Sequence, residues 1–343
     1  MAADGALAWK AAFARVLKGE ALDAVEAEAA MTEIMEGRVS EAAIAGYLVA
    51  LRMKGETAEE VVGSARAMRR ASTRIRPRRS PLLDTCGTGG DESGTLNFST
   101  AAAIVAAGAG AAVAKHGNRS VSSRCGSADV LQELGVAVDA EPEHVERSVE
   151  RHGFGFLFSP RFHPAMRHAM GARKALATRT IFNLLGPMTN PAGADRQVMG
   201  VYSLSVLELA AEALRLLGTA RAFVLHSADG LDEVSLAAPT HVIEVTQEGT
   251  RRFQIDVDAI GVAAAPLEAI RGGDAATNAE ALLRVFRGEK SATREGVVAN
   301  AALALVAADL AEDFREGAEK ARAAIDRGAA LALVESLRRE KPA

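Results

Sequence analysis

A glycine-rich loop near residue 90 carries the residue types that bind phosphate. It lies within residues 84–100, DTCGTGGDESGTLNFST, after a short apolar strand at 82–84 and before a helix that we expect from about Ser99. Glycines let backbone N–H groups approach a phosphate closely, and a helix N-terminus adds unpaired N–H groups and a positive dipole. The loop has neither the Gly-Lys-Ser/Thr of a P-loop nor the G-x-G-x-x-G dinucleotide spacing. It predicts a phosphate site, with an ordinary tight turn as the alternative.

A second donor-rich loop follows the next apolar strand. Residues 115–129, KHGNRSVSSRCGSAD, combine an ammonium, a guanidinium, an imidazole, an amide and several hydroxyls. This set suits a phosphate or pyrophosphate, although a hydrophilic surface loop would look similar. Loops at the carboxyl ends of parallel strands share one crevice, so the two loops together favour one large anionic ligand.

Two further segments could supply a cation site and a carboxylate site. Asp232 and Glu233, in HSADGLDEVS, offer the hard oxygens that Mg2+ needs when it shares a substrate phosphate, or they are solvated charge. Arg173 follows His163 by ten residues in HPAMRHAMGAR. A guanidinium has paired N–H donors that match the two oxygens of a carboxylate, but a surface arginine is the simpler alternative.

The elements that position these loops begin with helices. Residues 1–72 read as all-helical: Ser40 can cap one helix, Gly55 can end it, and Thr57 with Glu60 forms the pattern of a capping box. A linker over 74–81 contains two prolines that break helices. We expect a small helical domain over 1–73, completed by helices from about 165–190, and a hinge or linker over 74–81.

From residue 82 to 343 we expect an α/β domain. Short apolar strands at 82–84, 113–115, 154–158, 197–202 and 222–226 alternate with helices at 99–109, 128–134 and 206–217. That alternation predicts a mostly parallel central sheet. Segments 241–245 and 253–257, on either side of Gly249, predict an antiparallel hairpin. Residues 163–185 read as one long helix that packs back on the N-terminal helices, and the tail from Asn278 reads as helical.

Composition excludes several classes of protein. The 343 residues are 49% hydrophobic and 24% charged, with a net charge of −4, which argues against a nucleic-acid binder and predicts no nucleic-acid partner. Only two cysteines, Cys86 and Cys125, are present, so we expect a reducing compartment. The N-terminus does not read as a signal peptide, and no apolar run is long enough for a bilayer, so we predict a cytoplasmic protein without a membrane partner.

One short stretch is rich in arginine and reads as a solvated helix end or as a basic surface that steers a polyanion: Arg66, Arg69, Arg70, Arg74, Arg76, Arg78 and Arg79.

The motifs taken together resemble the anthranilate phosphoribosyltransferase family. GTGGD, Thr95, NFST, KHGNR with SS and GSAD, FNLLGPMTNPA at 182–192 and GLDE occur in that family's order and spacing. The similarity covers nearly the whole chain, including the early IAGYLVALRMKGETAEEVVGSARAMR. It implies the fold of the nucleoside phosphorylase-like phosphoribosyltransferases, a homodimer formed through the helical domain, and two Mg2+ ions per subunit. The implied reaction transfers the phosphoribosyl group of 5-phosphoribosyl 1-pyrophosphate (PRPP) to the amine of anthranilate in tryptophan biosynthesis.

The resemblance also implies site residues. The PRPP contacts would be Gly87, Gly90, Asp91, Thr95, Asn97, Phe98, Ser99, Thr100, Lys115, His116, Gly117, Asn118, Arg119, Ser120, Val121, Ser122, Ser123 and Ser127. Anthranilate would meet Gly87, Asn118, Arg173, His163 and Pro187. Mg2+ would be held by Ser99, Asp232 and Glu233. The chain departs from the family pattern at Ser227, where glycine is frequent, and at Phe98, a position that varies within the family.

The expected chemistry needs no dedicated base. Displacement at the ribose C1 should pass through an oxocarbenium-like state, as in glycoside cleavage, and the amine of anthranilate is already neutral at pH 7. We therefore assign no catalytic acid or base, although His116 could relay a proton. The alternatives are a pyrimidine nucleoside phosphorylase, a non-catalytic nucleic-acid-binding relative, and a phosphoribosyltransferase with another aromatic acceptor.

Overall fold

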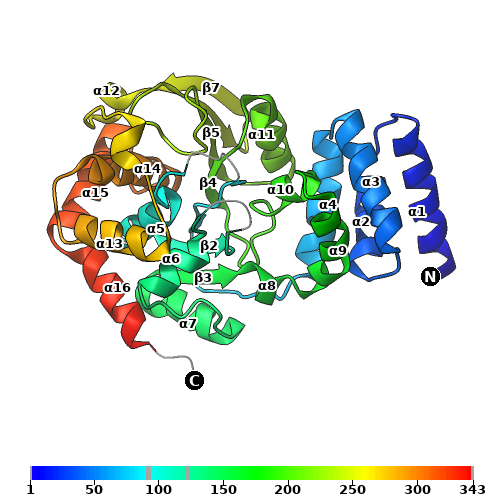
Figure 1. The fold of residues 1–343 in the computed structure, drawn as a ribbon, viewed down its shortest axis with the longest axis horizontal. Helices are drawn as coiled ribbons and strands as arrows, with labels where there is room; N and C mark the ends of the chain where they lie inside the picture. Colours follow the sequence, from blue (N-terminus) through cyan, green and yellow to red (C-terminus); the bar gives the residue numbers. More distant parts are fainter. Residues whose placement is uncertain (1, 90–93, 121–123, 341–343) are drawn as a thin grey trace.

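The computed structural model describes residues 2–89, 94–120 and 124–340 of the chain. Four helices come first and form a bundle at one end of the molecule, with α1 outermost (Figure 1). Their bounds are α1 (Ala2–Leu17), α2 (Ala24–Met35), α3 (Glu41–Lys54) and α4 (Ala58–Ala71). Among the described residues, no helix combines the length and the apolar character needed to cross a membrane.

Local capping explains where α3 and α4 begin and end. Ser40 caps α3 by accepting a hydrogen bond from the backbone N of Ala43 at 3.4 Å, and Gly55 ends the helix with a φ of 86°. Thr57 and Glu60 form the expected capping box: Thr57 Oγ1 accepts from Glu60 N at 3.3 Å and Glu60 Oε2 accepts from Thr57 N at 2.9 Å. The three sequence predictions for this region are confirmed.

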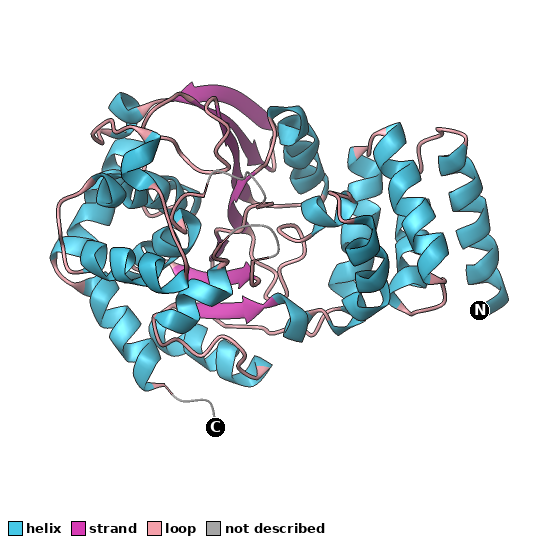
Figure 2. Ribbon diagram, viewed as in Figure 1, coloured by secondary structure: helices cyan, strands magenta, loops and turns pink. Residues whose placement is uncertain are grey.

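A seven-stranded sheet forms the centre of the second part of the chain (Figure 2). Its strand order is β3-β2-β1-β4-β5-β6-β7, and the first five strands in that order are parallel. The strands are β1 (Leu82–Asp84), β2 (Ala112–Gly117), β3 (Phe154–Phe158), β4 (Arg196–Gly200), β5 (Arg221–Ser227), β6 (Thr240–Thr246) and β7 (Thr250–Ile255). A helical unit beside a mostly parallel α/β sheet with an antiparallel hairpin is therefore confirmed.

The antiparallel part is larger than the sequence predicts. β6 pairs antiparallel with β5 as well as with β7, so the hairpin is the end of a three-stranded meander. The connection from β5 to β6 carries Asp232 and Glu233. The last strand also ends earlier than expected, because Asp256 accepts a hydrogen bond from Ala259 N at 2.9 Å and caps α12 (Val257–Ile260).

Helices cover both faces of the sheet. Alternate strand residues face opposite sides, so that Leu83 and Val113 lie in one apolar cluster with α5 (Phe98–Gly108) and α14 (Ala292–Ala307), while Leu82 and Ala114 lie in another with α7 (Pro142–His152). The remaining helices are α6 (Ser127–Glu133), α8 (Ser159–Phe162), η1 (Pro164–Met166), α9 (Arg167–Leu176), α10 (Ile181–Leu185), η2 (Leu204–Val206), α11 (Leu207–Leu216), η3 (Leu267–Ile270), α13 (Ala275–Phe286), α15 (Phe314–Asp326) and α16 (Ala329–Arg339).

The single helix expected over residues 163–185 is wrong. Pro164 lacks an N–H and disfavours helical geometry at His163, so α8 ends before it and the short η1 follows. Ala177, at a φ of 45°, ends α9, and α10 starts after Thr180. The expected packing on the N-terminal helices is nevertheless present, because α9 and α10 share one apolar cluster with α2, α3 and α4.

The segment between the two parts is bonded along its length to the α/β part. Thr73 N donates to Phe162 O at 2.9 Å, Arg76 N to Glu146 Oε2 at 2.8 Å, and Arg79 Nε to Glu150 O at 2.9 Å. Other members of the arginine-rich stretch also have partners within the protein: Arg69 Nε donates to Met188 O at 2.8 Å. These contacts favour the structural interpretation of this stretch over a free basic surface.

Candidate active site

The first glycine loop packs against the end of β4 and the carboxylate loop. Thr88 N donates to Gly200 O at 2.9 Å. A Cβ at Gly87 would lie 3.0 Å from Gly200 O and 3.4 Å from Asp232 Oδ2, so only glycine lets the loop approach this closely. Two predicted contacts of this loop, Gly90 and Asp91, lie outside the described residues.

The start of α5 brings two of the predicted metal ligands together. Ser99 N donates to Glu233 Oε1 at 2.9 Å, which places a carboxylate at the positive end of a helix. Asp232 adjoins Glu233 in the chain, and its carboxylate faces Gly87. Among the described residues, no three His, Cys, Asp or Glu side chains gather around one point. Two carboxylates and the Ser99 hydroxyl are hard oxygen donors, the type that Mg2+ takes when its other ligands are phosphate oxygens and water.

The carboxylate loop is shaped by Ser227, one of the departures from the family pattern. Its Oγ donates to Glu233 O at 2.7 Å and accepts from Ser235 N at 3.2 Å. Ser227 Oγ also lies 2.7 Å from Thr240 Oγ1 on β6. The serine thus ties both ends of the loop to the sheet behind the two carboxylates.

The residues around the start of α5 differ in what they can offer a ligand. Asn97 links the two phosphate loops, because its Nδ2 donates to Cys125 O at 3.1 Å. Phe98 and Thr100 have fully buried side chains, and the Phe98 ring packs against Gly296. Any contact of these two with a ligand would therefore come from the main chain. Thr95 forms a β-bridge with Arg271, beside η3.

Lys115, at the start of the second loop, is buried beneath the first. Its Nζ donates to Thr85 O at 2.7 Å and lies 3.2 Å from Thr85 Oγ1. Thr85 Oγ1 in turn donates to Ser99 O at 2.8 Å. The ammonium therefore joins β2 to β1 and to the first turn of α5, and it adds positive charge directly under the glycine loop.

Asp84 and Asn190 form a buried polar centre behind the two loops. Asp84 accepts from His116 N at 3.1 Å and from Asn190 Nδ2 at 2.7 Å, and Asn190 Nδ2 also donates to Ala114 O at 2.7 Å. Burial raises the pKa of Asp84 to about 6, although Lys115 and these hydrogen bonds lower it. Our sequence reasoning assigned neither residue a role. The feature of the sequence that could have indicated a role for Asp84 is a carboxylate at the end of an otherwise apolar strand.

The rest of the second loop folds onto α6. Ser127 Oγ donates to Asn118 O at 3.2 Å, and a Cβ at Gly117 would lie 2.3 Å from Ser127 Oγ. Arg119 Nη1 forms an ion pair with Asp129 Oδ1 at 2.9 Å, and Ser120 N donates to Asp129 Oδ2 at 3.0 Å. The predicted PRPP contact Arg119 is thus directed to α6. Three other predicted contacts lie outside the described residues: Val121, Ser122 and Ser123.

Asp129 is ionised, and its carboxylate holds this loop in place. Burial raises its pKa, but hydrogen bonds from Ser120 N, Gly126 N and Arg119 outweigh burial, and the net pKa is lowered. Gly126 N donates to Asp129 Oδ2 at 2.9 Å. The charge of Asp129 is therefore part of the loop's internal framework.

Two buried histidines, both predicted ligand contacts, lie side by side. The rings of His116 and His163 have centroids 5.0 Å apart, and His116 Nδ1 lies 3.0 Å from Gly186 O. Burial lowers the pKa of His116 to about 3 and that of His163 to about 4. Both rings are therefore neutral at pH 7. Each Nε2 is buried without a hydrogen-bond partner among the described residues, so each can accept or donate a hydrogen bond to a ligand.

Arg173 lies on α9 with its guanidinium over an aromatic ring. Its Cζ is 5.2 Å from the centre of the Phe182 ring on α10. Burial lowers the pKa of Arg173 below its usual value, and the group remains a cation at neutral pH. Pro187, the last predicted acceptor contact, is buried, and its carbonyl accepts from Gln197 Nε2 at 2.7 Å.

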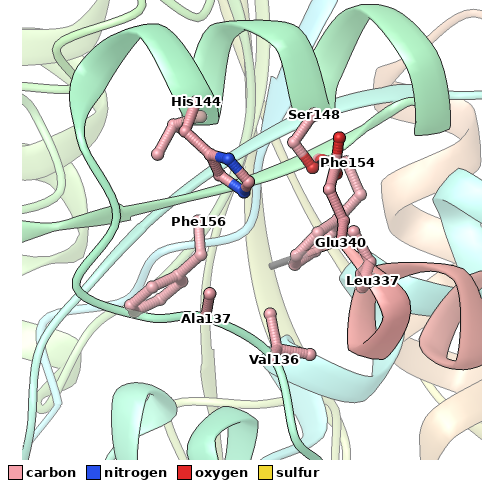
Figure 3. A pocket seen from close by; sticks show the side chains of 9 residues that line it. Val136, Ala137, His144, Ser148, Phe154, Phe156, Leu337 and Glu340 are labelled. Atoms are coloured by element: carbon pink, nitrogen blue, oxygen red, sulfur yellow. Dashed lines mark hydrogen bonds between the residues drawn. The ribbon is translucent and has the colours of Figure 1, made fainter. Parts of the chain in front are cut away.

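A small cavity elsewhere in the molecule is not part of this site. It measures about 20 Å³ and lies among α7, β3 and α16, where His144, Ser148 and Glu340 meet apolar side chains (Figure 3). Phe154, at the amino end of β3, lines it, whereas the phosphate loops follow the carboxyl ends of their strands. A space of that size holds one water molecule, not a sugar phosphate.

Comparisons with known proteins agree with the geometry. A model of the glycosyl transferase family helical bundle domain matches residues 10–72, and a model of the same family's a/b domain matches residues 79–331. A relative from Pelotomaculum thermopropionicum, named anthranilate phosphoribosyltransferase, is 51% identical over 328 residues, covering 96% of this chain and 95% of the relative.

Solved structures give the same result. The anthranilate phosphoribosyltransferase of Thermus thermophilus superposes with a TM-score of 0.91 at 45% identity, covering 95% of this chain and 98% of that one. The Saccharomyces cerevisiae enzyme, in complex with PRPP and Mg, has a TM-score of 0.87 at 27% identity, covering 96% of each chain. The chain described here belongs to the anthranilate phosphoribosyltransferases of the glycosyl transferase family.

Proposed function

We propose that this protein transfers the phosphoribosyl group of PRPP to the amine of anthranilate. The products are N-(5-phosphoribosyl)anthranilate and pyrophosphate, and the step belongs to tryptophan biosynthesis in the cytoplasm. One observation carries the proposal: the hydrogen bond from Ser99 N to Glu233 joins a carboxylate loop to a helix start that follows a glycine loop. This contact supports the proposal, because hydrogen-bond donors for phosphate and oxygen ligands for Mg2+ would then lie in one place. Relatives over almost the full length bear the name of this activity.

In this proposal, PRPP lies along the two loops after β1 and β2. Its pyrophosphate takes N–H groups of the glycine loop and lies at the positive end of α5, above the buried Lys115. Asp232, Glu233 and the Ser99 hydroxyl would hold Mg2+, with two ions per subunit. When bound, Mg2+ neutralises charge that grows on the departing pyrophosphate.

Anthranilate would bind at the histidine end of the site. Arg173 is the cation for its carboxylate, while Gly87 and Asn118 lie where acceptor and donor meet. The arylamine is neutral at pH 7, so orientation contributes more than proton removal. Neutral His116 and His163 can accept a hydrogen bond from the amine without adding positive charge beside the oxocarbenium-like ribose.

We also propose the domain organisation and a homodimer. The helical domain would comprise residues 1–73 and the helices of about 165–190, with 74–81 as the linker and 82–343 as the α/β domain. The shared apolar cluster of α9, α10 and the N-terminal helices supports this division. α3 and α9 pack on each other and expose large apolar side chains, namely Val49, Met53 and Met170, which supports a self-association surface on this domain.

Anthranilate fluorescence gives a direct test. Anthranilate should be consumed with PRPP and Mg2+ together and should persist when either is omitted or when Mg2+ is chelated. Asp232→Ala with Glu233→Ala should reduce Mg2+-dependent turnover by about 100-fold or more, because the ion's protein ligands are lost. Exposed Glu268→Ala is the matched control. Turnover without Mg2+, or full activity of the double variant, would refute the metal assignment, and phosphorolysis of pyrimidine nucleosides would refute the reaction.

A further inference from the structure

The link between α9 and α10 contacts both halves of the molecule. This link, residues 177–180, was expected to be helical but is not. Arg52 of α3 donates through its Nη1 to the carbonyl oxygen of Arg179. The guanidinium Cζ of Arg179 lies 4.5 Å from the centre of the Tyr202 ring, just after β4. Arg179 therefore touches the helical bundle with its backbone and the end of the sheet with its side chain.

Tyr202 continues this series of contacts into the glycine loop. Its backbone N donates to Thr88 Oγ1 at 3.0 Å, and Thr88 N donates to Gly200 O at 2.9 Å. Thr88 lies next to Gly87, where donor and acceptor sites meet in the proposed function. A change in the position of Tyr202 would thus be transmitted to the loop by one hydrogen bond.

We propose that the contact between Arg179 and Tyr202 is a positioning contact, which holds the acceptor-binding helix α9 at a fixed distance from the PRPP-binding glycine loop. This inference rests on the proposed function for the identity of the two ligands. Neither residue is assigned to the reaction itself. Their role is to fix the distance between Arg173, in the last turns of α9, and Gly87.

The physical setting favours a strong contact. A guanidinium within about 6 Å of an aromatic ring is attracted to the ring face, and partial burial increases that attraction. Tyr202 is half-buried; burial, followed by the charge of Glu56, raises its pKa, so the phenol is neutral at pH 7. The two ends of the 177–180 link are bonded to their own helices, since Ala177 N donates to Arg173 O at 3.2 Å and Thr180 N donates to Asn183 Oδ1 at 3.0 Å. The contacts of Arg179 join the middle of the link to the rest of the molecule.

The contact explains how a link outside both sites can affect the reaction. Displacement requires the amine nitrogen and the ribose C1 to approach within about 3–3.5 Å, and errors of about 1 Å are costly. The acceptor arginine and the donor loop belong to different parts of the chain, separated by almost 90 positions. The series from Arg52 through Arg179 and Tyr202 to Thr88 is a direct route between them.

A double-mutant cycle tests the proposal. Arg179→Ala and Tyr202→Leu should each lower kcat/KM for PRPP by about 3- to 10-fold, the range expected for a partly buried cation–ring contact. KM for anthranilate should rise in parallel, because the contact joins both sites. The double variant should be no worse than the more affected single variant, since each change removes the same interaction. Tyr202→Phe keeps the ring and should restore most of the loss.

Matched controls separate this role from others. Arg251→Ala removes a similar arginine–ring contact, 4.9 Å from Phe253 on the edge strand β7, and should leave both KM values unchanged. If Arg179 bound substrate directly, the effects of the two single variants would multiply in the double variant, and that result would overturn the proposal. A loss in Tyr202→Phe equal to that in Tyr202→Leu would also overturn it.

Calorimetric titration with PRPP and Mg2+ provides a readout that does not depend on turnover. We expect Kd for PRPP to rise by about 3- to 10-fold in each single variant and by no more in the double variant. If the wild-type protein binds PRPP but does not consume anthranilate, the proposed acceptor is refuted. The double-mutant cycle can still be measured in that case through Kd for PRPP. Unchanged Kd and KM in folded variants of an active enzyme would refute only the positioning contact.

Discussion

At the scale of single residues, the site combines few exposed charges with many buried polar groups. Lys115, Asp84 and Asn190 are all buried, and each has hydrogen-bond partners within the protein. Leaving one of these groups unpaired costs more than the bond itself contributes. Arg173 and the two neutral histidines are the side chains that we propose for the acceptor.

Arg173 should determine anthranilate binding. Arg173→Ala removes the guanidinium over Phe182, and we expect KM for anthranilate to rise by about 10- to 100-fold while KM for PRPP changes by less than about threefold. Steady-state kinetics with each substrate varied in turn would measure the two constants. The neighbouring exposed Lys174→Ala is the control. A larger rise in KM for PRPP would remove Arg173 from the acceptor site.

His163 should make stability depend on pH. Its pKa is lowered to about 4 by burial, against about 6.5 in an unfolded chain, so between these values the unfolded state binds a proton that the folded state does not. Stability is therefore lost as pH falls from 6.5 toward 4. His116 acts in the same direction, and Asp84, with its raised pKa, acts in the opposite one.

Chemical denaturation at pH 7 and pH 5 would measure this linkage. We expect His163→Gln to reduce the acid-induced loss of unfolding free energy by about 1–2 kcal/mol, whatever its stability at pH 7. An unchanged difference between the two pH values would show that His163 is protonated in the folded protein.

At the scale of elements, close packing of loops and helices sets where each donor lies. Gly117, at the end of β2, is one such close approach: a Cβ there would meet Ser127 Oγ at 2.3 Å and the Phe156 ring at 2.7 Å. The second phosphate loop could not keep its path with a larger residue at this position. β2, α6 and β3 must move apart to admit even one methyl group.

Gly117→Ala should therefore destabilise the protein and weaken PRPP binding. Overpacking of this kind costs about 1–3 kcal/mol of unfolding free energy, and we expect Kd for PRPP to rise at the same time. Denaturant titration and calorimetry would measure the two effects. Gly186→Ala is the stability control, because the nearest atom that its Cβ would meet, Phe182 O, is 3.8 Å away. Equal stability of the two variants would contradict the packing argument.

Glu60 joins three helices of the bundle. Its carboxylate is fully buried and accepts from Leu22 N at 3.0 Å, from Thr57 N at 2.9 Å and from Lys54 Nζ at 2.9 Å. Glu60→Ala leaves these donors unpaired, and we expect a loss of about 3–5 kcal/mol in unfolding free energy. Exposed Glu59→Ala should change it by less than about 0.5 kcal/mol. Similar values for the two variants would show that water replaces the lost carboxylate.

At the scale of the whole molecule, the helical unit and the sheet share one continuous core. α11 packs on the sheet and on α4, so apolar residues of the bundle and of β4–β6 lie in one cluster. The proposed acceptor residue Arg173 lies on a helix that packs with the bundle, and the proposed PRPP loops follow strands of the sheet (Figure 1). The reaction therefore depends on how these two parts are held together.

Self-association through α3 and α9 is the prediction at this scale. Met53 is 83% exposed and Met170 is 49% exposed, which is unusual for large apolar side chains. Met53→Lys with Met170→Lys should shift the protein from dimer to monomer in sedimentation experiments, since charges are disfavoured in the centre of an interface. Leu216→Lys, on α11, is the control. A dimer that survives both lysines would place the interface elsewhere.

The sequence by itself determined most of the elements and the family. Capping residues and short apolar runs depend on neighbours in the chain, so the limits of α3 and α4, the strands and the glycine loop could be predicted from local spacing. The motifs identified the family for the same reason, because their order and spacing are properties of the chain alone. What local spacing could not reveal was the break between α9 and α10, since the alanine-rich stretch favours helix throughout.

Only the tertiary structure decided which polar groups are bonded to one another within the protein. Arg119 pairs with Asp129 across ten positions, Asp84 meets Asn190 across 106, and the helix start at Ser99 meets Glu233 across 134. Such contacts arise because parallel strands distant in sequence end at the same edge of one sheet. Burial, which also exists only in the folded chain, then keeps His116 and His163 neutral and makes Lys115 part of the framework.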